Sequence, residues 1–140
     1  MATQANMIFV NLPVKDLNKS IDFFTKMGFE FNPQYTDENA TCMIISEHIF
    51  AMLLVEDFFK TFTDKEIADS TKSAEVIVAL SAESRERVDE LVDKALAAGG
   101  SFSKEPLDHG FMYSRSFQDL DGHLWEFMYM DESAAQAQQG

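Results

Sequence analysis

The sequence contains a single cysteine, Cys42, so no disulfide can form within the chain. Its opening residues, MATQANMIFV, include neither the basic segment nor the long apolar segment of a secretory signal peptide. No apolar run approaches the roughly 20 residues that a membrane-spanning helix needs. These absences predict a soluble protein of the cytoplasm, where thiols stay reduced. Cys42, beside the apolar residues MII, is expected to be a buried structural thiol.

Basic residues are also scarce. The chain has 11 Lys and Arg against 24 Asp and Glu, which gives a formal net charge of -13. Binding to nucleic acid or to an anionic membrane needs clustered positive charge, so neither is expected as a partner. The sequence also has no P-loop, no G-x-G-x-x-G, no G-x-S-x-G and no Cys-x-x-Cys pattern. Nucleotide cofactors and the common nucleophile motifs are therefore not predicted.

The sequence is rich in Phe and Met, with 13 and 8 residues of 140. A chain of this length can bury a sizeable core as a single domain. Most of these side chains are expected in that core, and some of them in an adaptable apolar cavity.

An internal repeat divides the chain into two halves. MIFVNLPVKDLNKSIDFFTKMGFEF, residues 7–31, and EVIVALSAESRERVDELVDKALAAGGSF, residues 75–102, each read as a strand, a helix, a glycine stop and a new strand. Leu12 corresponds to Leu80, and Gly28 to Gly99. Further strands are predicted at about 29–36, 40–46 and 49–56, and at about 101–104, 111–118 and 123–130. Each half is therefore predicted to be a βαβββ module.

The module bounds follow from these elements. Module one is expected at about 6–56, a linker at 57–73, module two at about 74–130 and a frayed or loosely helical tail at 131–140. Asp16 and Ser84 are the expected helix N-caps, because each side chain can accept a free backbone N–H of the first turn. TDKE at 63–66 has the capping-box pattern and predicts a short helix through Ala68. Phe58, Phe59 and Phe62 before it either pack against the sheet or form a lid.

Strand alternation assigns the faces. In HLWEFMYM, residues 123–130, the aromatic set Trp125, Phe127 and Tyr129 is predicted to face the helix. Glu126 then lies on the other, enclosed face, where an unpaired carboxylate would be costly to bury. Arg115, on the neighbouring antiparallel strand, is the candidate partner, although the sequence does not decide which way its side chain points.

The chain resembles the vicinal oxygen chelate superfamily, which contains glyoxalase I, bleomycin-resistance proteins and extradiol dioxygenases. The resemblance rests on VKDLNKSIDFFTKMGFEF, on FQDLDGHLWEF with its D-x-D-G-x-x-x-E pattern, and on the repeat. It implies an α+β fold in which paired βαβββ modules form an incomplete barrel around a cavity. It also implies a homodimer.

Metal-dependent members of this family bind a divalent ion through four side chains on the first and fourth strands of the modules. The matching positions here are Phe9, about Leu53, Ile77 and Glu126. Only Glu126 has a ligating atom, so neither a metal nor another cofactor is predicted. A slip of two residues would bring in Asn11 and Glu75 and would give a weak, oxygen-rich site.

Three functions stay open. The first is metal-free binding of a small, partly apolar molecule in the cavity between the modules. The second is an enzyme, a lyase or isomerase of the glyoxalase type such as lactoylglutathione lyase, with Glu126 as general base or as the remaining metal ligand. The third is a dimerisation domain with a vestigial cavity. Of the three histidines, His48 and His123 flank turns, whereas His109 could overhang the cavity mouth. The residues expected to line the cavity are Phe9, Asn11, Leu53, Glu75, Ile77, His109, Tyr113, Arg115 and Glu126.

Overall fold

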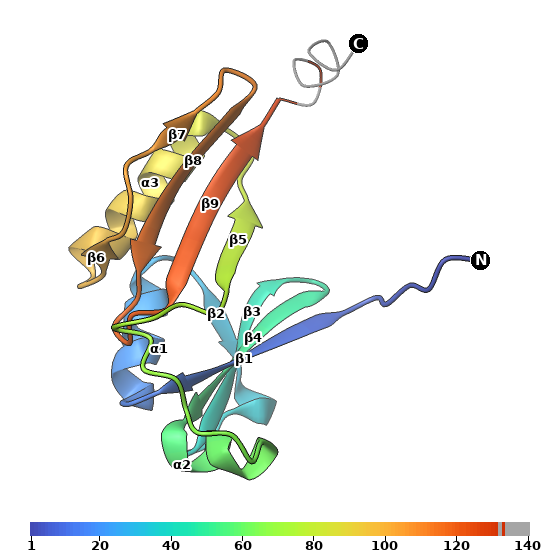
Figure 1. Ribbon diagram of the computed structural model, residues 1–140, viewed down its shortest axis with the longest axis vertical. Helices are drawn as coiled ribbons and strands as arrows, with labels where there is room; N and C mark the ends of the chain where they lie inside the picture. The colour runs from blue at the N-terminus through green and yellow to red at the C-terminus, as the bar shows by residue number, and fades with distance from the viewer. Residues whose placement is uncertain (132, 134–140) are drawn as a thin grey trace. The chain divides into compact units, whose positions relative to one another are not determined.

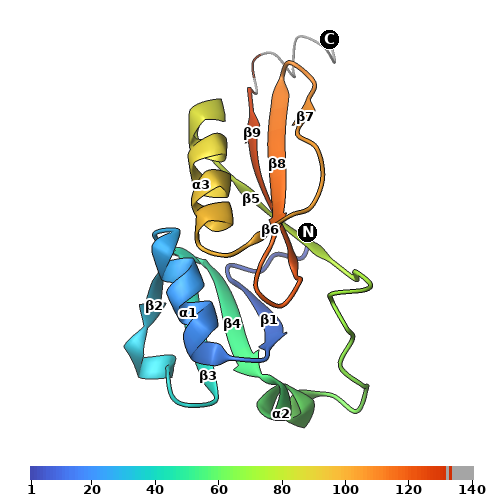
Figure 2. The ribbon, with the colours of Figure 1, turned by 90° about the vertical axis from the view of Figure 1, so that its left-hand side faces the viewer.

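The computed structural model describes residues 1–131 and 133, and most of the predicted tail at 131–140 lies outside these residues. The chain divides into two compact units, Met1–Ala68 and a second unit that begins at Asp69. Each unit has one sheet with a helix against it (Figures 1 and 2). In the described residues no helix is long and apolar enough to span a membrane.

The first unit has a four-stranded sheet in the order β1-β4-β3-β2. Parallel pairing joins β1 to β4, and the remaining pairs are antiparallel. Its elements are β1 (Ile8–Val14), α1 (Leu17–Lys26), β2 (Glu30–Asn32), η1 (Pro33–Tyr35), β3 (Ala40–Ser46), β4 (Ile49–Val55), α2 (Glu56–Phe59) and η2 (Lys60–Phe62).

The second unit repeats this topology. Its sheet has the order β5-β9-β8-β6, with β7 paired to β8, and β5 runs parallel to β9. Its elements are β5 (Ile77–Ser81), α3 (Arg85–Ala97), β6 (Ser101–Phe102), β7 (Leu107–Asp108), β8 (Met112–Gln118) and β9 (Leu124–Met130). The prediction of an α+β fold built from two βαβββ modules is therefore confirmed. In the part of the chain that the structure describes, neither sheet closes on itself.

The helix ends follow the sequence signals. Asp16 Oδ1 accepts the backbone N–H of Lys19 at 3.1 Å, and Ser84 Oγ accepts that of Arg87 at 3.0 Å. Gly28 and Gly99 follow the two helices with φ of 104° and 113°, a backbone conformation that favours glycine. Both N-cap predictions and both glycine stops are confirmed.

The predicted helix at 63–68 is wrong. These residues form no helix, and the helical turns lie earlier, in α2 and η2. Thr63 Oγ1 accepts the N–H of Lys65 at 3.1 Å, but only Ile67 follows as a large apolar residue, so a helix there would have no apolar stripe to pack. The earlier turns instead hold the aromatic residues, and the Phe58 and Phe62 rings meet edge to face at 5.1 Å.

Two smaller differences concern strand lengths. The strand predicted at 29–36 stops at Asn32, because Asn32 Oδ1 caps a 3₁₀ turn that begins at Pro33. The short strand β7 was not predicted. Cys42 is buried, as expected, and burial raises the pKa of its thiol.

Candidate functional site

The turn before β9 is held by the buried carboxylate of Asp119. Its Oδ2 accepts the indole N–H of Trp125 at 2.9 Å, and its Oδ1 accepts the backbone N–H groups of Asp121 and His123, each at 3.0 Å. Burial raises the pKa of Asp119, while its hydrogen bonds and the nearby His123 oppose this rise. These bonds fix Trp125 on the helix side of the sheet, where it is 1% exposed.

Alternation along β9 then places Glu126 on the opposite face. Trp125 and Phe127 are buried, whereas Glu126 is half-buried. The predicted face of the aromatic set is confirmed for these two residues. Register pairs Glu126 with Ala79 of β5 on one side and with Ser116 of β8 on the other.

The neighbours of Glu126 on this face are small, apolar or uncharged polar side chains. Leu124 and Met128 precede and follow it on the same face of β9, and Ile77 lies two residues before Ala79 on β5. Among the residues that the structure describes, none forms a hydrogen bond or an ion pair with the Glu126 side chain. Its carboxylate is therefore available to a ligand.

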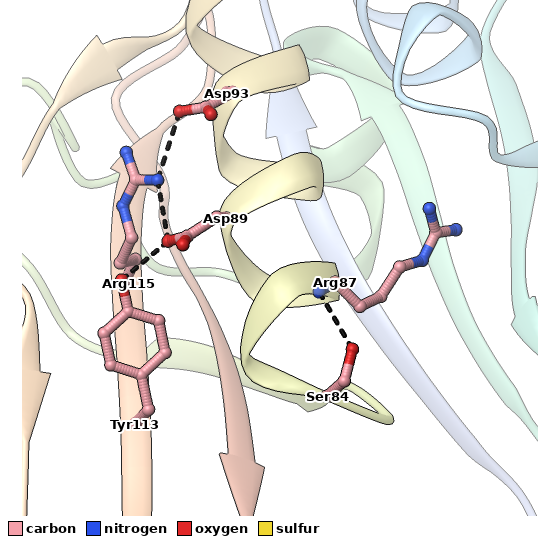
Figure 3. Close-up of polar contacts among 6 residues, drawn as sticks. All are labelled: Ser84, Arg87, Asp89, Asp93, Tyr113 and Arg115. Atoms are coloured by element: carbon pink, nitrogen blue, oxygen red, sulfur yellow. Dashed lines mark hydrogen bonds and ion pairs between the residues drawn. The ribbon is translucent and has the colours of Figure 1, made fainter.

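Arg115 does not provide the expected partner. It pairs with Phe127, so it lies on the helix side, and its Nη1 contacts Asp89 and Asp93 of α3, each at 3.1 Å (Figure 3). Tyr113 points to the same side and donates its hydroxyl to Asp89 at 2.6 Å. The structure thus places Tyr113 and Arg115 on the face opposite to Glu126.

Opposite charges meet in this helix-side cluster. The hydrogen bond from Tyr113, followed by the contacts with Arg115, holds the pKa of Asp89 below its usual range. Burial and the bond to Asp89 raise the pKa of Tyr113. Arg85 lies over the Tyr113 ring, 4.5 Å from its centre, and pairs with Asp108. Both arginines are therefore engaged away from Glu126.

Three other predicted residues lie on the second unit at different distances from Glu126. Ile77 shares its face and is 58% exposed. Glu75 is exposed and precedes β5, four positions from Ala79, which corresponds to roughly 13 Å of extended chain. His109 lies in the turn after β7, beyond the pair of Met112 with Met130. Register brings only Ile77 near Glu126.

The first unit separates its predicted residues onto two faces. Phe9 and Asn11 alternate with the buried Leu12, and the Phe9 ring stacks on Phe50 at 5.1 Å. Leu53 pairs with Leu12 and is 0% exposed, so it belongs to the core on the other face. The residue of β4 that pairs with Asn11 is Met52.

The repeat relates Met52 to Glu126. Leu12 pairs with Leu53 in the first unit, and the equivalent Leu80 pairs with Phe127 in the second. One residue earlier, Met52 therefore occupies in β4 the place that Glu126 occupies in β9. A thioether stands in one copy where a carboxylate stands in the other.

The sequence did not identify Ala79 and Ser116 as the cross-strand neighbours of Glu126, nor Met52 as its equivalent in the first unit. The Asp121–Gly122 turn was a usable signal, because an antiparallel register read outward from it pairs Gln118 with Leu124 and then Ser116 with Glu126. The parallel pairings of β1 with β4 and of β5 with β9 had no such local signal, since residues far apart in sequence form them.

The residues present do not fit a divalent metal. Among the residues described, no group of three or more His, Cys, Asp or Glu side chains could hold an ion. The cross-strand neighbours of Glu126 are a methyl group and a hydroxyl group. The equivalent positions in the first unit carry Asn11 and Met52. A single carboxylate provides too few ligands for a stable divalent metal site.

The chain belongs to the glyoxalase/bleomycin resistance protein/dioxygenase superfamily, whose family model matches residues 6–127. A search of curated proteins found no match.

Solved structures share the fold. A hypothetical protein of S. aureus is 31% identical, with a TM-score of 0.75, over 91% of this chain and 95% of that one. A glyoxalase/bleomycin resistance protein/dioxygenase family enzyme from Burkholderia phytofirmans PsJN is 16% identical, with a TM-score of 0.76, over 90% and 99%. The fosfomycin resistance protein FosX from Listeria monocytogenes is 22% identical, with a TM-score of 0.64, over 91% and 94%.

Proposed function

We propose that this chain binds a small, partly apolar molecule, without a metal ion, on the face of the second sheet that carries Glu126. One observation carries the proposal: a half-buried carboxylate without a protein partner among the described residues stands between small and apolar side chains. Its cross-strand neighbours Ala79 and Ser116 have small side chains, and Leu124, Met128 and Ile77 offer hydrocarbon or thioether surface.

The family supports a small-molecule ligand. Its name includes bleomycin resistance proteins, and one structural neighbour is named a fosfomycin resistance protein. Fold likeness alone gives no function, and the support for a ligand comes from the residues around Glu126. Homodimer formation and a cytoplasmic location remain predictions from the sequence.

A second candidate function is catalysis with Glu126 as general base, in a lyase or isomerase of the glyoxalase type. The observation that favours it is that the half-buried Glu126 carboxylate forms no ion pair with a cation among the described residues. Such a carboxylate could accept a proton from a bound substrate. In this function Glu126→Gln would abolish turnover while ligand binding persisted.

The test of metal-free binding begins with metal content. The protein is purified without chelator and its metal is measured per chain, and lactoylglutathione lyase activity is then assayed with added Ni, Zn, Mn or Fe. We expect metal well below one ion per chain and no metal-dependent activity. Stoichiometric metal that is lost in Glu126→Ala would overturn the metal-free proposal.

Binding itself is tested by a thermal-shift screen of small molecules, since a ligand of the folded state raises the melting temperature by mass action. Stabilising compounds are retested against Glu126→Gln. The matched control is Glu105→Gln, which removes the same charge from an exposed loop of the same unit. Only the Glu126 variant is expected to lose the stabilisation.

A further inference from the structure

We infer that the molecule bound at Glu126 is a small organic cation, a protonated amine that carries a hydrocarbon group. This inference rests on the proposed function and names the chemical class of its ligand. Its basis is the distribution of charge on the second sheet, because Arg85 and Arg115 are paired with aspartates away from Glu126.

Water solvates the Glu126 carboxylate when no ligand is bound. Glu126 is half-buried, so solvent still hydrates its carboxylate. A ligand that covers this face removes that water, and a carboxylate without compensation in an apolar surrounding is strongly disfavoured. The ligand must therefore supply a positive charge or strong hydrogen-bond donors itself.

The protein itself offers the Glu126 carboxylate few hydrogen-bond donors. Ser116, the cross-strand neighbour in β8, can offer one hydroxyl hydrogen, and Ala79 offers none from its side chain. Ser81, Ser114 and Gln118 lie one pair further along on the same face, and none of them carries a positive charge. Arg115 is held by Asp89 and Asp93 on the opposite face. Neither neighbour neutralises Glu126, so the sheet presents one net negative charge to whatever covers this face.

The residues around Glu126 suit an ammonium group better than a metal ion. A hard divalent ion such as Ca²⁺ or Mg²⁺ would need further oxygen ligands, which the side chains of Leu124, Met128 and Ala79 cannot provide. An ammonium group needs only one carboxylate for a charge-assisted hydrogen bond. The apolar side chains on either side of Glu126, together with the exposed Ile77, then match a hydrocarbon group attached to that ammonium.

The experiment uses three probes of similar size and different charge: 2-phenylethylamine, 2-phenylethanol and 3-phenylpropionate. Each is titrated into the full-length, ¹⁵N-labelled protein, and amide shifts are followed by NMR at Ala79, Ser116 and Glu126. We expect the amine to saturate these shifts at a concentration at least tenfold below that of the alcohol, and the carboxylate to bind more weakly than both.

The variants assign the effect to one side chain. Glu126→Gln keeps the shape but removes the charge, so the amine should bind it no better than the alcohol does. Glu105→Gln should leave the preference for the amine unchanged. Raising the salt concentration should weaken amine binding and leave alcohol binding nearly constant.

The outcomes separate the two proposals. Equal or tighter binding of the alcohol or the carboxylate at this face would overturn the cationic ligand and leave the proposed binding function standing. Failure of all three probes to shift these amides would overturn both. Tight amine binding that survives in Glu126→Gln would overturn the assignment to this carboxylate.

Discussion

Trp125 donates its indole N–H to the buried carboxylate of Asp119, 2.9 Å away, across the turn from which β9 begins. The bond joins the two ends of this turn and holds the large ring beneath the sheet. Because Glu126 is the next residue, the same bond determines which face its carboxylate occupies. The Asp119 side chain thus orients Glu126 indirectly, by holding Trp125 in place.

Replacing Asp119 should destabilise the fold. Asp119→Ala would leave the Trp125 indole and two backbone N–H groups without their acceptor, and we expect a loss of about 2 to 4 kcal/mol in the free energy of unfolding. Asp119→Asn keeps an acceptor oxygen, so its free energy of unfolding should fall by less. Urea unfolding measures both, with Asp64→Ala at an exposed position as control. Equal stability of Asp119→Ala and the control would contradict this account.

Gly122 is required for two separate reasons, which a pair of variants can resolve. Its φ is 87°, and a Cβ there would lie 2.8 Å from the backbone oxygen of Ser70. Gly110 in the same unit has a similar φ of 81° but open space around it. Backbone strain alone should therefore lower the free energy of unfolding of Gly110→Ala by about 1 kcal/mol. In Gly122→Ala the close contact with Ser70 adds to the strain, and the loss should be of order 3 kcal/mol.

The measurement for this pair is again urea unfolding. Ser70 also donates its hydroxyl to the backbone oxygen of Asp121, so the clash in Gly122→Ala falls on a segment that is held in place. Equal losses for the two alanine variants would show that close packing at Gly122 contributes nothing.

The acid side of the stability profile should depend on Asp89. Its pKa is lowered in the folded state, so its favourable contribution is present above the ordinary Asp pKa of about 3.9 and is lost as the pH falls through the lower folded value. At pH 7, the free energy of unfolding of the wild type should exceed that of Asp89→Asn by about 1 kcal/mol or less, because the Asp89 side chain is 48% exposed. This gap should close below pH 4, as thermal melts at a series of pH values would reveal. A gap that widens on acidification would refute the assignment.

The cap of α3 offers a fourth test. Ser84→Ala removes the acceptor for the N–H of Arg87 and should cost about 1 kcal/mol. Ser84→Asp retains an acceptor and adds a favourable charge at the positive end of the helix, so it should match wild type or exceed it. Circular dichroism melts of the two variants provide the comparison, and equal melting temperatures for both would contradict a capping role.

The sequence predicted those features that depend on neighbours along the chain. Asp16 and Ser84 could be recognised as caps because a cap bonds an amide three residues away. The buried face of Trp125 and Phe127 followed from alternation within one strand. The repeat predicted the same topology twice, because two similar sequences bury similar stripes.

The features that the sequence did not predict depend on contacts between distant segments. Alternation alone did not fix the direction of Arg115, which follows from its pairing with Phe127 and the two aspartates on α3. The capping-box pattern at 63–66 predicted a helix that forms instead at 56–62, where aromatic side chains can pack. Local propensity is a weak guide where no apolar face supports it.

Met52 in the first unit and Glu126 in the second occupy equivalent places, so the molecule contains its own control. Two copies of one architecture sit in the same polypeptide, and at the matching place one is acidic and the other uncharged. Any property that follows from the architecture alone should appear in both copies, and any property that needs the acid should appear only in the second. The first unit therefore already carries an uncharged side chain at the place where an experiment would neutralise Glu126 in the second.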